Sequence, residues 1–331
     1  MKKLQVALMV GGNSSEREVA LGSAAMVGNA FDRAKYDVMT IDVHGHDWAY
    51  NDGQGRRWLL DRNDFSVTVD GNKTVFDYAF IMIHGTPGED GKLQGYLELM
   101  GIPYSSCDQV SSVVTFDKKL CKRTVKGITG LNLAKEIVLS KGIKINAEDI
   151  ISKLGLPLFV KPNASGSSCG VTKVKSAEEI PAALEKAFSE SDEVLIEEFL
   201  DGREFGCGVL VAKGKEYVFP VTEIISKNDF FDYQAKYTAG FSDEITPADI
   251  SKELSAELQR LALQAYNACG CRGVTRIDFI VTKGQEDPYM IEINSIPGMS
   301  PGSIVPKQVV AAGMTMTELI DLIIEDTLCS R

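Results

Sequence analysis

Two short segments near the C-terminal end of the chain set the strongest constraint on its fold, because both have the period of a β-strand. Residues 276–281 (RIDFIV) and 290–294 (MIEIN) alternate polar and apolar side chains. Residues 283–288 between them (KGQEDP) are rich in residues that favour turns. The sequence therefore predicts an antiparallel β-hairpin.

The predicted hairpin brings four polar side chains to one face of the sheet. If the chain turns about Gln285, Asp278 lies opposite Glu292. Arg276 then lies opposite Asn294. Two carboxylates that face each other across strands repel, which indicates a cation between them. Asp, Glu and Asn oxygens suit Mg²⁺, which binds through a few carboxylates and substrate phosphates. The hairpin thus favours ATP-dependent chemistry; the alternative is a surface hairpin with solvated charges.

Composition narrows the class of protein. A chain of 331 residues, 44% hydrophobic and 24% charged, is typical of a globular protein with two or three domains. A net charge of −11 argues against broad nucleic-acid binding, which depends on clustered Lys and Arg. No apolar stretch approaches the length of a membrane span, and residues 1–10 are typical of a first strand rather than a signal peptide.

The cysteines indicate a reducing compartment. Their number is odd, seven, and no Cys-x-x-Cys pair occurs. The closest pair, Cys269 and Cys271, is interpreted as structural. We expect a cytoplasmic protein with free thiols, small-molecule substrates and no membrane partner.

The chain divides into three blocks by its pattern of strands and helices. The first block alternates, which favours a parallel sheet with covering helices: strands at 4–10, 37–43, 78–83 and 102–104, helices at 16–31 and 94–100. A Lys-rich helix at 116–126 opens a smaller, mixed block with strands at 136–139, 158–161 and 171–174 and a helix at 177–188. The last block is rich in strands, with helices at 251–269 and 315–327 and an irregular loop at 226–248. The predicted domains are 1–106, 107–196 and 197–331.

The segment around Lys161 is predicted to be a flap over phosphates. A strand leads through Pro162 into a small polar loop, residues 163–170, and then into another strand. Backbone N–H groups and hydroxyls of such a loop can surround phosphate oxygens, with Lys161 as a point charge. Gly-Lys-Ser/Thr and a following helix are both missing, so the loop is not a Walker A motif. An ordinary Ser/Gly hairpin loop is the alternative.

An apolar strand ending in Glu197 and Glu198 follows. Such a strand end can present backbone groups and a carboxylate to the adenine amino group, and Glu204 suits a ribose hydroxyl. An acidic turn that is only solvated is the alternative reading of this segment.

Two loops follow strands of the first block and should lie side by side. Gly11 and Gly12 precede Ser15-x-x-Glu18, a predicted capping box. Capping does not explain Glu16, which lies at the carboxyl end of the first strand, where open α/β sheets bind ligands. The spacing is not Gly-x-Gly-x-x-Gly, which argues against a Rossmann dinucleotide site. His84 begins the second loop.

Taken together, these segments resemble the D-alanine–D-alanine ligases of the ATP-grasp superfamily over nearly the whole chain. The matching motifs, in order, are Gly11-Gly-x-Ser-x-Glu16, His84-Gly-x-x-Gly-Glu-Asp-Gly91, Asp117-Lys118, Lys161-Pro-x-x-x-Gly-Ser-Ser, Glu197 with Glu204, Lys236-Tyr237, Arg276-x-Asp278, Glu292-x-Asn294-x-x-Pro-Gly-Met299 and Ser303.

The resemblance implies an ATP-grasp fold: an N-terminal parallel-sheet domain and two α+β domains that clasp ATP. It implies these ATP-binding residues: Lys118, Lys161, Glu197, Phe199, Leu200, Glu204 and Lys236. It implies a metal site for two Mg²⁺ ions, which Mn²⁺ can replace, at Asp278, Glu292 and Asn294. It implies these catalytic residues: Glu16, Ser167, Tyr237, Arg276 and Ser303. It implies these substrate-binding residues: Glu16, His84, Gly298 and Ser303.

The implied reaction joins two D-alanines for peptidoglycan precursor synthesis. The first D-alanine, with its ammonium on Glu16, attacks the γ-phosphate of ATP while Mg²⁺ and Lys236 neutralise charge. Closure of the flap and of the 226–248 loop keeps water from the acyl phosphate. The amine of the second D-alanine then attacks the carbonyl, and Arg276 and the Gly298 N–H stabilise the oxyanion.

Four positions depart from the family's usual pattern, namely Ala20, Ala164, Ser165 and Glu198. None of them removes a catalytic group, but they leave ATP affinity and flap dynamics open. Tyr237 favours D-alanine over D-lactate as the second substrate. A homodimer is expected from the family.

Two other functions stay open. One is a different ATP-grasp carboxylate–amine ligase, against which Glu16, Tyr237 and Ser303 argue. The other is a nucleotide-binding protein without catalysis, which is disfavoured because buried charge is costly to retain without use.

Overall fold

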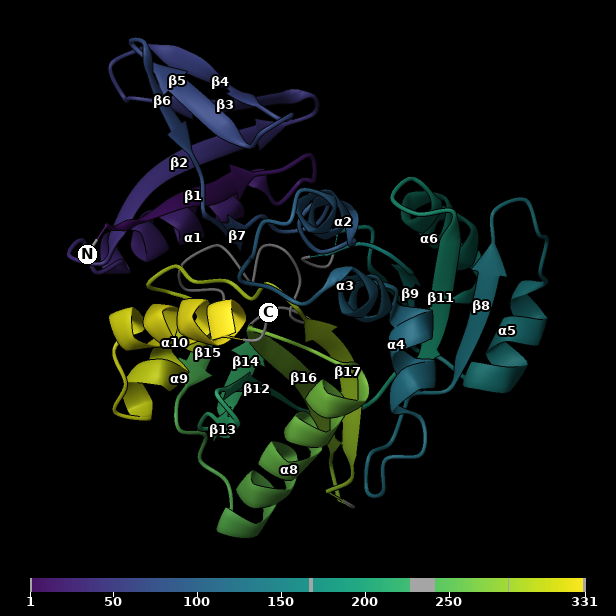
Figure 1. The fold of residues 1–331 in the computed structure, drawn as a ribbon. Coiled ribbons are helices and arrows are strands. Elements are labelled where there is room, and N and C mark those ends of the chain that lie inside the picture. The colour runs from purple at the N-terminus through teal and green to yellow at the C-terminus, as the bar shows by residue number, and fades with distance from the viewer. Residues whose placement is uncertain (1, 167–168, 227–241, 285, 330–331) are drawn as a thin grey trace.

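The computed structural model describes residues 2–166, 169–226, 242–284 and 286–329. In these ranges the chain forms three β-sheets with helices packed on them (Figure 1). The predicted α/β class is confirmed. Ser167, Lys236 and Tyr237 lie outside the described residues, as does 227–241 of the loop predicted at 226–248.

The N-terminal sheet has the order β6-β5-β4-β3-β2-β1-β7. Its strands are β1 (Leu4–Gly11), β2 (Tyr36–His44), β3 (Asp47–Asn51), β4 (Arg57–Asp61), β5 (Ser66–Val69), β6 (Asn72–Val75) and β7 (Tyr78–Met82). β1 pairs in parallel with β2 and β7, as predicted for the strands of the first block. The antiparallel meander β3–β6 was not predicted, because its strands are short and only partly buried.

The strand predicted at 102–104 is wrong. Tyr104 makes a single parallel bridge to Ala79, and this pairing does not extend into a β-ladder. Pro103 has no N–H to donate, which limits pairing at this edge of the sheet.

Helices α1 (Arg17–Ala30), α2 (Lys92–Leu99) and α10 (Met316–Cys329) share a core with this sheet, and α9 (Ile304–Ala311) packs on α10 and on a strand of the C-terminal sheet. The C-terminal helix α10 lies beside α1, so both ends of the chain meet in one core (Figure 1). Ile320 and Ile324 of α10 are buried together with Leu8 of β1. The same core contains Leu210, so α10 joins the first sheet to the last one.

The central sheet has the order β10-β9-β11-β8, and every pair in it is antiparallel. Its elements are β8 (Glu136–Ser140), α5 (Ala147–Leu154), β9 (Leu158–Pro162), β10 (Thr172–Val174), the 3₁₀ turn Ala177–Glu179, α6 (Ile180–Phe188) and β11 (Glu193–Glu198). The three predicted strands of this block are confirmed. The predicted helix at 177–188 is confirmed as α6 with a 3₁₀ first turn. The short helix α5 was not predicted; Asn146 caps it by accepting a hydrogen bond from the Glu148 N–H.

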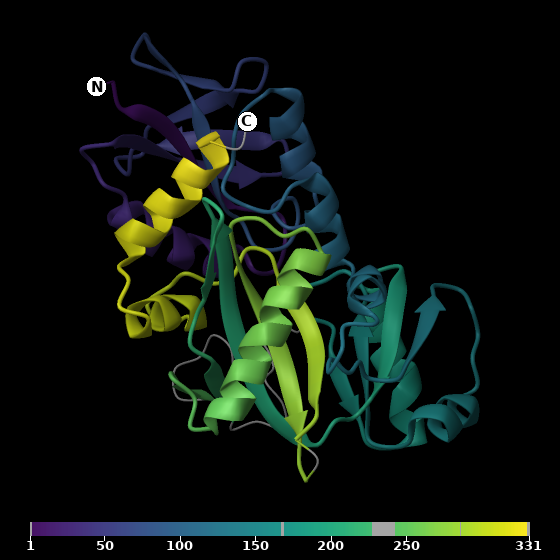
Figure 2. The same cartoon turned by 60° about the horizontal axis from the view of Figure 1, so that its bottom comes forward.

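The C-terminal sheet has the order β15-β14-β12-β16-β17, with β13 also paired to β12. Its strands are β12 (Gly202–Ala212), β13 (Lys215–Val218), β14 (Thr222–Ser226), β15 (Ser242–Ile245), β16 (Val274–Thr282) and β17 (Pro288–Asn294). Helix α8 (Lys252–Ala268) covers one face of this sheet (Figure 2). The strand β15 falls inside the segment predicted to be an irregular loop.

The Lys-rich helix predicted at 116–126 is confirmed as α4 (Lys118–Val125). The helix before it, α3 (Gln109–Phe116), was not predicted. Asp117 has an extended backbone between them, and its carboxylate accepts a hydrogen bond from the Leu120 N–H. An Asp at this position starts a new helix instead of continuing the old one.

The division into domains 1–106, 107–196 and 197–331 stays a prediction. Within the structure, Cys107, Cys121 and Val125 are buried in the core of the C-terminal sheet rather than in that of the central sheet. The helices α3 and α4 therefore connect the first sheet to the last.

Candidate active site

The β16–β17 hairpin has the predicted register at its functional end. Arg276 is paired with Asn294, and Asp278 with Glu292. Nearer the turn the register shifts by one, because Phe279 pairs with Met290. A β-bulge therefore separates the four polar residues from the turn.

Positive side chains balance the two carboxylates of the hairpin. The Arg276 Nε and a terminal guanidinium nitrogen donate to the two carboxylate oxygens of Asp278 at 2.7 and 2.8 Å. The Asn294 side-chain N–H donates to Asp278 at 2.9 Å, and Lys118 Nζ lies 3.3 Å from a Glu292 oxygen. Arg276 and Asp278 are both buried, so the loss of either partner would leave an uncompensated charge in the protein interior.

The donors of the hairpin fit a divalent metal by their chemistry. Asp278, Glu292 and Asn294 supply carboxylate and amide oxygens, which are hard ligands. Within the described ranges no group of three or more His, Cys, Asp or Glu could hold a metal ion. A metal at the hairpin would therefore need oxygens from a substrate, such as phosphates, beside these three residues.

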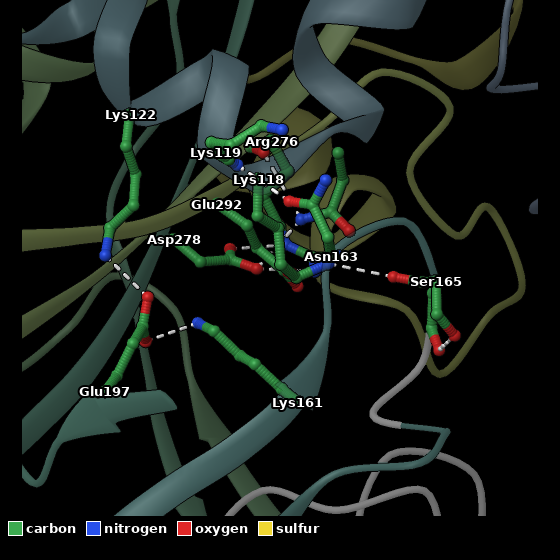
Figure 3. Close-up of polar contacts among 12 residues, drawn as sticks. Lys118, Lys119, Lys122, Lys161, Asn163, Ser165, Glu197, Arg276, Asp278 and Glu292 are labelled. Atoms are coloured by element: carbon green, nitrogen blue, oxygen red, sulfur yellow. Dashed lines mark hydrogen bonds and ion pairs between the residues drawn. The ribbon is translucent and has the colours of Figure 1, made fainter. Parts of the chain in front are cut away.

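A chain of buried charges crosses the opposite side of the site (Figure 3). Glu197 at the end of β11 lies between two lysines: Lys161 Nζ and Lys122 Nζ each approach one of its oxygens at 2.5 Å. Lys122 also donates to Glu136 at 2.7 Å. Burial alone would raise the pKa of Glu197, but the charges of Lys161 and Lys122 outweigh it and lower this pKa.

The two lysines respond differently to the same carboxylate. Burial, with the nearby positive charges of Lys122 and Lys118, lowers the pKa of Lys161 in spite of Glu197. Burial also acts against the charge of Lys122, but Glu197 and Glu136 raise its pKa. Lys161 thus has an incomplete set of negative partners, as expected of a cation that awaits an anionic ligand.

A cleft of about 530 Å³ lies between the central and C-terminal sheets. Its lining contains eight residues predicted to bind ATP or metal, namely Lys118, Lys161, Glu197, Phe199, Leu200, Glu204, Asp278 and Glu292. The structure therefore brings predicted site residues from five separate segments of the chain to one cavity.

The flap lies against the loop after β1. Lys118 Nζ donates to the Ser165 carbonyl at 2.8 Å, and Ser15 Oγ lies 3.0 Å from Cys169 Sγ. Gly166 packs on the carboxylate of Glu16: a β-carbon at Gly166 would sit 2.8 Å from Glu16 Cδ and 2.9 Å from its Oε1. Only glycine allows this approach, so the flap and Glu16 form one surface.

The predicted capping box at the start of α1 is wrong. The N-cap is Glu16, and no side chain caps the helix. Ser15 contacts the flap instead, while Ser14 Oγ donates to the His84 carbonyl at 2.8 Å. The hydroxyls have partners in other loops, and these contacts fix the loop after β1 beside the loop after β7.

His84 lies buried where these loops meet the end of β17. Burial lowers its pKa to about 4, which outweighs a hydrogen bond to the Ile296 backbone, and nearby Arg276 lowers it further. The ring is therefore neutral, and its Nε2 lies 3.4 Å from Ser23 Oγ. His84 was predicted to bind substrate, and the structure connects it to the segment that carries Gly298.

Gly298 and Ser303 are close neighbours. A β-carbon at Gly298 would sit 2.8 Å from Ser303 Oγ, and that hydroxyl accepts a hydrogen bond from the Ser300 N–H at 3.1 Å. Ser303 is also the N-cap residue of α9. The two residues predicted to receive the second substrate thus share one turn.

Three residues of the site were not predicted. Lys122 could have been found, because it follows Lys118 by four residues on one helix face. Glu89 stood inside the quoted His84–Gly91 motif but had no assigned role. Ser23 gave no signal, since a serine in a helix is ordinary.

No helix in the described part of the chain is long and apolar enough to cross a membrane. Its cysteines are all free thiols, as predicted: Cys107, Cys121, Cys169, Cys207, Cys269, Cys271 and Cys329.

Comparison with known proteins gives consistent matches along the chain. The family models "D-ala D-ala ligase N-terminus" and "D-ala D-ala ligase C-terminus" match residues 5–107 and 128–325. A D-alanine--D-alanine ligase of Phocaeicola vulgatus is 47% identical over 324 residues, which is 98% of this chain and 99% of that protein. One of Flavobacterium johnsoniae is 46% identical over 320 residues, 97% of this chain and 98% of the relative.

Solved structures of similarly named ligases and synthetases match the fold over nearly the whole chain. D-alanyl-alanine synthetase A of Vibrio cholerae has a TM-score of 0.88 at 29% identity, covering 99% of each chain. The VanG D-Ala:D-Ser ligase of Enterococcus faecalis has a TM-score of 0.85 at 32% identity, covering 98% of this chain and 99% of that one.

Proposed function

The chain belongs to the D-alanine–D-alanine ligase family, and we propose that it joins two D-alanines to D-alanyl-D-alanine, with conversion of ATP to ADP and phosphate. One observation carries the proposal. Lys118 Nζ bonds to the flap at Ser165 and pairs with Glu292 of the hairpin, so one cation joins the two parts of a phosphate site. Glu16, the proposed ligand of the first ammonium group, packs directly on this flap.

ATP occupies the cleft between the central and C-terminal sheets. Its phosphates meet Lys118, Lys161 and Lys236. The adenine meets Glu197 and the backbone of Phe199 and Leu200, and the ribose meets Glu204. The lining of the cleft supports these roles for the residues that are described.

Asp278, Glu292 and Asn294 would hold two Mg²⁺ ions, and Mn²⁺ can replace them. Bound there, the metal neutralises the charge of the phosphates and makes the γ-phosphorus easier to attack. The protein's own part is to keep two carboxylates at this position, for which Arg276 and Lys118 supply the balancing charge.

The first step activates one D-alanine. Glu16, with Ser167 and Tyr237, binds this substrate through its ammonium group. A carboxylate oxygen of the D-alanine forms a bond to the γ-phosphorus, and the bond from that phosphorus to the bridging oxygen of ADP breaks. The flap excludes water, which would otherwise hydrolyse the acyl phosphate.

The second step forms the amide. His84, Gly298 and Ser303 hold the second D-alanine, and its amine attacks the acyl carbonyl after losing a proton. Arg276 and the Gly298 N–H stabilise the negative oxygen of the tetrahedral intermediate. The C–O bond to phosphate then breaks, which leaves the dipeptide and free phosphate.

The test is direct incubation of the protein with ATP, Mg²⁺ and D-alanine, followed by mass identification of the product and measurement of phosphate. We expect D-alanyl-D-alanine and phosphate in equal amounts. A product formed only when D-serine, D-lactate or another acid is added would assign the chain to a different ligation. No ADP with any D-amino acid would overturn every enzymatic reading.

We also propose a cytoplasmic homodimer that supplies the dipeptide for peptidoglycan precursors. The family supports this proposal. Sedimentation of the purified protein tests the dimer, and a single species at the monomer mass would contradict it.

A further inference from the structure

The segment 296–299 is held from outside its own sheet. It follows β17 and carries Gly298, whose N–H is the proposed oxyanion donor, so the inference below rests on the proposed function. Two residues that fix the segment, Glu89 in the loop after β7 and Ser23 in α1, lie more than 200 positions earlier in the chain.

Glu89 holds one end of the segment. One carboxylate oxygen accepts from the Ile296 N–H at 3.2 Å, and the other accepts from the Gly85 N–H at 2.8 Å. Both bonds are buried, and Glu89 is 8% exposed. A single carboxylate therefore ties the loop after β7 to the loop after β17.

Ser23 holds the other end. Its hydroxyl accepts from the Met299 N–H at 3.1 Å and lies 3.4 Å from Nε2 of His84. Ser23 is completely buried in α1. The His84 ring also bonds to the Ile296 backbone, so it connects the two ends.

These contacts leave one backbone donor in the segment. Ile296 and Met299 use their N–H groups on Glu89 and Ser23, and Ser300 uses its own on Ser303. Pro297 has no N–H. Among the residues that the structure describes, the Gly298 N–H has no hydrogen-bond partner. Gly298 is also partly exposed, between two buried neighbours.

We propose that Ser23 and Glu89 are positioning residues for amide formation: they fix both ends of the 296–299 segment so that the Gly298 N–H points at the reacting carbonyl. Neither side chain touches a reacting atom. An oxyanion donor stabilises a transition state most when it is already oriented, because the free energy needed to reorient it would otherwise add to the activation barrier. The N-terminal loops, which bind the first substrate, thus orient the donor for the second step.

Loss of orientation should affect the second step more than the first. The acyl phosphate would still form, but its attack by the amine would slow, and water would consume more of it. The quantity to measure is therefore the amount of dipeptide formed per phosphate released.

Ser23→Ala removes the acceptor of the Met299 N–H with little change of volume. Glu89→Gln keeps the shape but can accept only one of the two N–H groups well. We expect each variant to form about tenfold less dipeptide per phosphate than the wild type, since each loses a buried hydrogen bond that acts on the oriented donor. Deuterium exchange at the amides of 295–300 should also be faster in both.

Ser66→Ala is the matched control. Ser66 is an equally buried serine that bonds to Asp64 in the distant meander. It should keep one dipeptide per phosphate even if the protein is less stable. A ratio that stays at one in both Ser23→Ala and Glu89→Gln overturns the inference, whatever the change in rate. A wild-type protein that forms no dipeptide would instead overturn the proposed function.

Discussion

Arg276 donates hydrogen bonds to the buried carboxylate of Asp278 and is also the proposed donor to the oxyanion. Replacing it with alanine removes the positive oxyanion donor, so we expect kcat to fall by about 10²–10³-fold. The KM for ATP should change by less than about threefold, because Lys118 and Lys161 remain in the cleft. Steady-state kinetics with ATP and D-alanine varied separately checks both values. An intact kcat with a raised ATP KM would remove the oxyanion role.

His84 makes stability depend on pH in a definite direction. Its pKa in the folded protein is about 4, below the ordinary value of 6.5. The unfolded chain therefore binds more protons between these values, and the wild type loses stability as pH falls from 6.5 to 4. The full contribution is present above pH 6.5 and amounts to about 3 kcal/mol.

The measurement compares wild type with His84→Gln, which cannot gain a proton in this range. The difference in free energy of unfolding between the two proteins should shift against the wild type across this window and stay constant above it. A difference that does not change between pH 7 and 4 would show that the ring titrates normally.

At the scale of elements, the flap depends on the absence of a side chain at Gly166. Alanine there would come within 2.8 Å of Glu16 Cδ, so either the flap or the Glu16 carboxylate, the proposed ligand of the first ammonium group, would have to shift. We expect kcat/KM for D-alanine to fall roughly tenfold or more, the cost of overpacking a close contact. Binding of ATP alone, measured by calorimetry, should change little.

Gly22→Ala is the control for this variant. Gly22 lies in α1, and a β-carbon there meets nothing within 4 Å. It should leave activity unchanged and raise helix stability slightly. Equal losses in both variants would mean that the effect of Gly166→Ala does not come from the flap.

The elements also show what the sequence could and could not predict. The register of Asp278 with Glu292 was predictable because strict alternation fixes which face each residue takes. The bulge beside Phe279 was not, because one extra residue near a turn leaves that alternation intact on either side. The break at Asp117 was visible only as a capping residue inside an apparently continuous Lys-rich helix. Ser15 looked like a cap, but its partner lies in the flap, about 150 residues away.

At the scale of the whole molecule, the series of sequence motifs predicted which segments meet at the site. It did not predict which side chains hold those segments in place. Glu89 and Ser23 act through partners far along the chain, so neither periodicity nor local spacing could assign them a role. Spacing could have drawn attention to Lys122, four residues after Lys118, but not to its partner Glu197 on β11. The shared core of α1 and α10 is likewise a long-range contact. Sequence motifs identify residues that contact a ligand more readily than residues that orient the ligand-contacting ones. A residue of the orienting kind can be of a common type, because only its place in the fold gives it this role.

A ligand that lies between two sheets should stabilise the molecule as a unit. In the proposed site, ATP with Mg²⁺ contacts both walls of the cleft, so at 100 times its Kd it should add about 2.7 kcal/mol to the free energy of unfolding. For a chain of this size the expected rise in Tm is roughly 4 °C. Thermal unfolding with and without EDTA checks the metal's share: chelation should remove most of the rise, because the phosphates and the two carboxylates of the hairpin then repel. The Glu292→Gln variant should show a smaller response to Mg²⁺ at the same ATP concentration. A rise that survives both EDTA and this substitution would place the metal away from the β16–β17 hairpin.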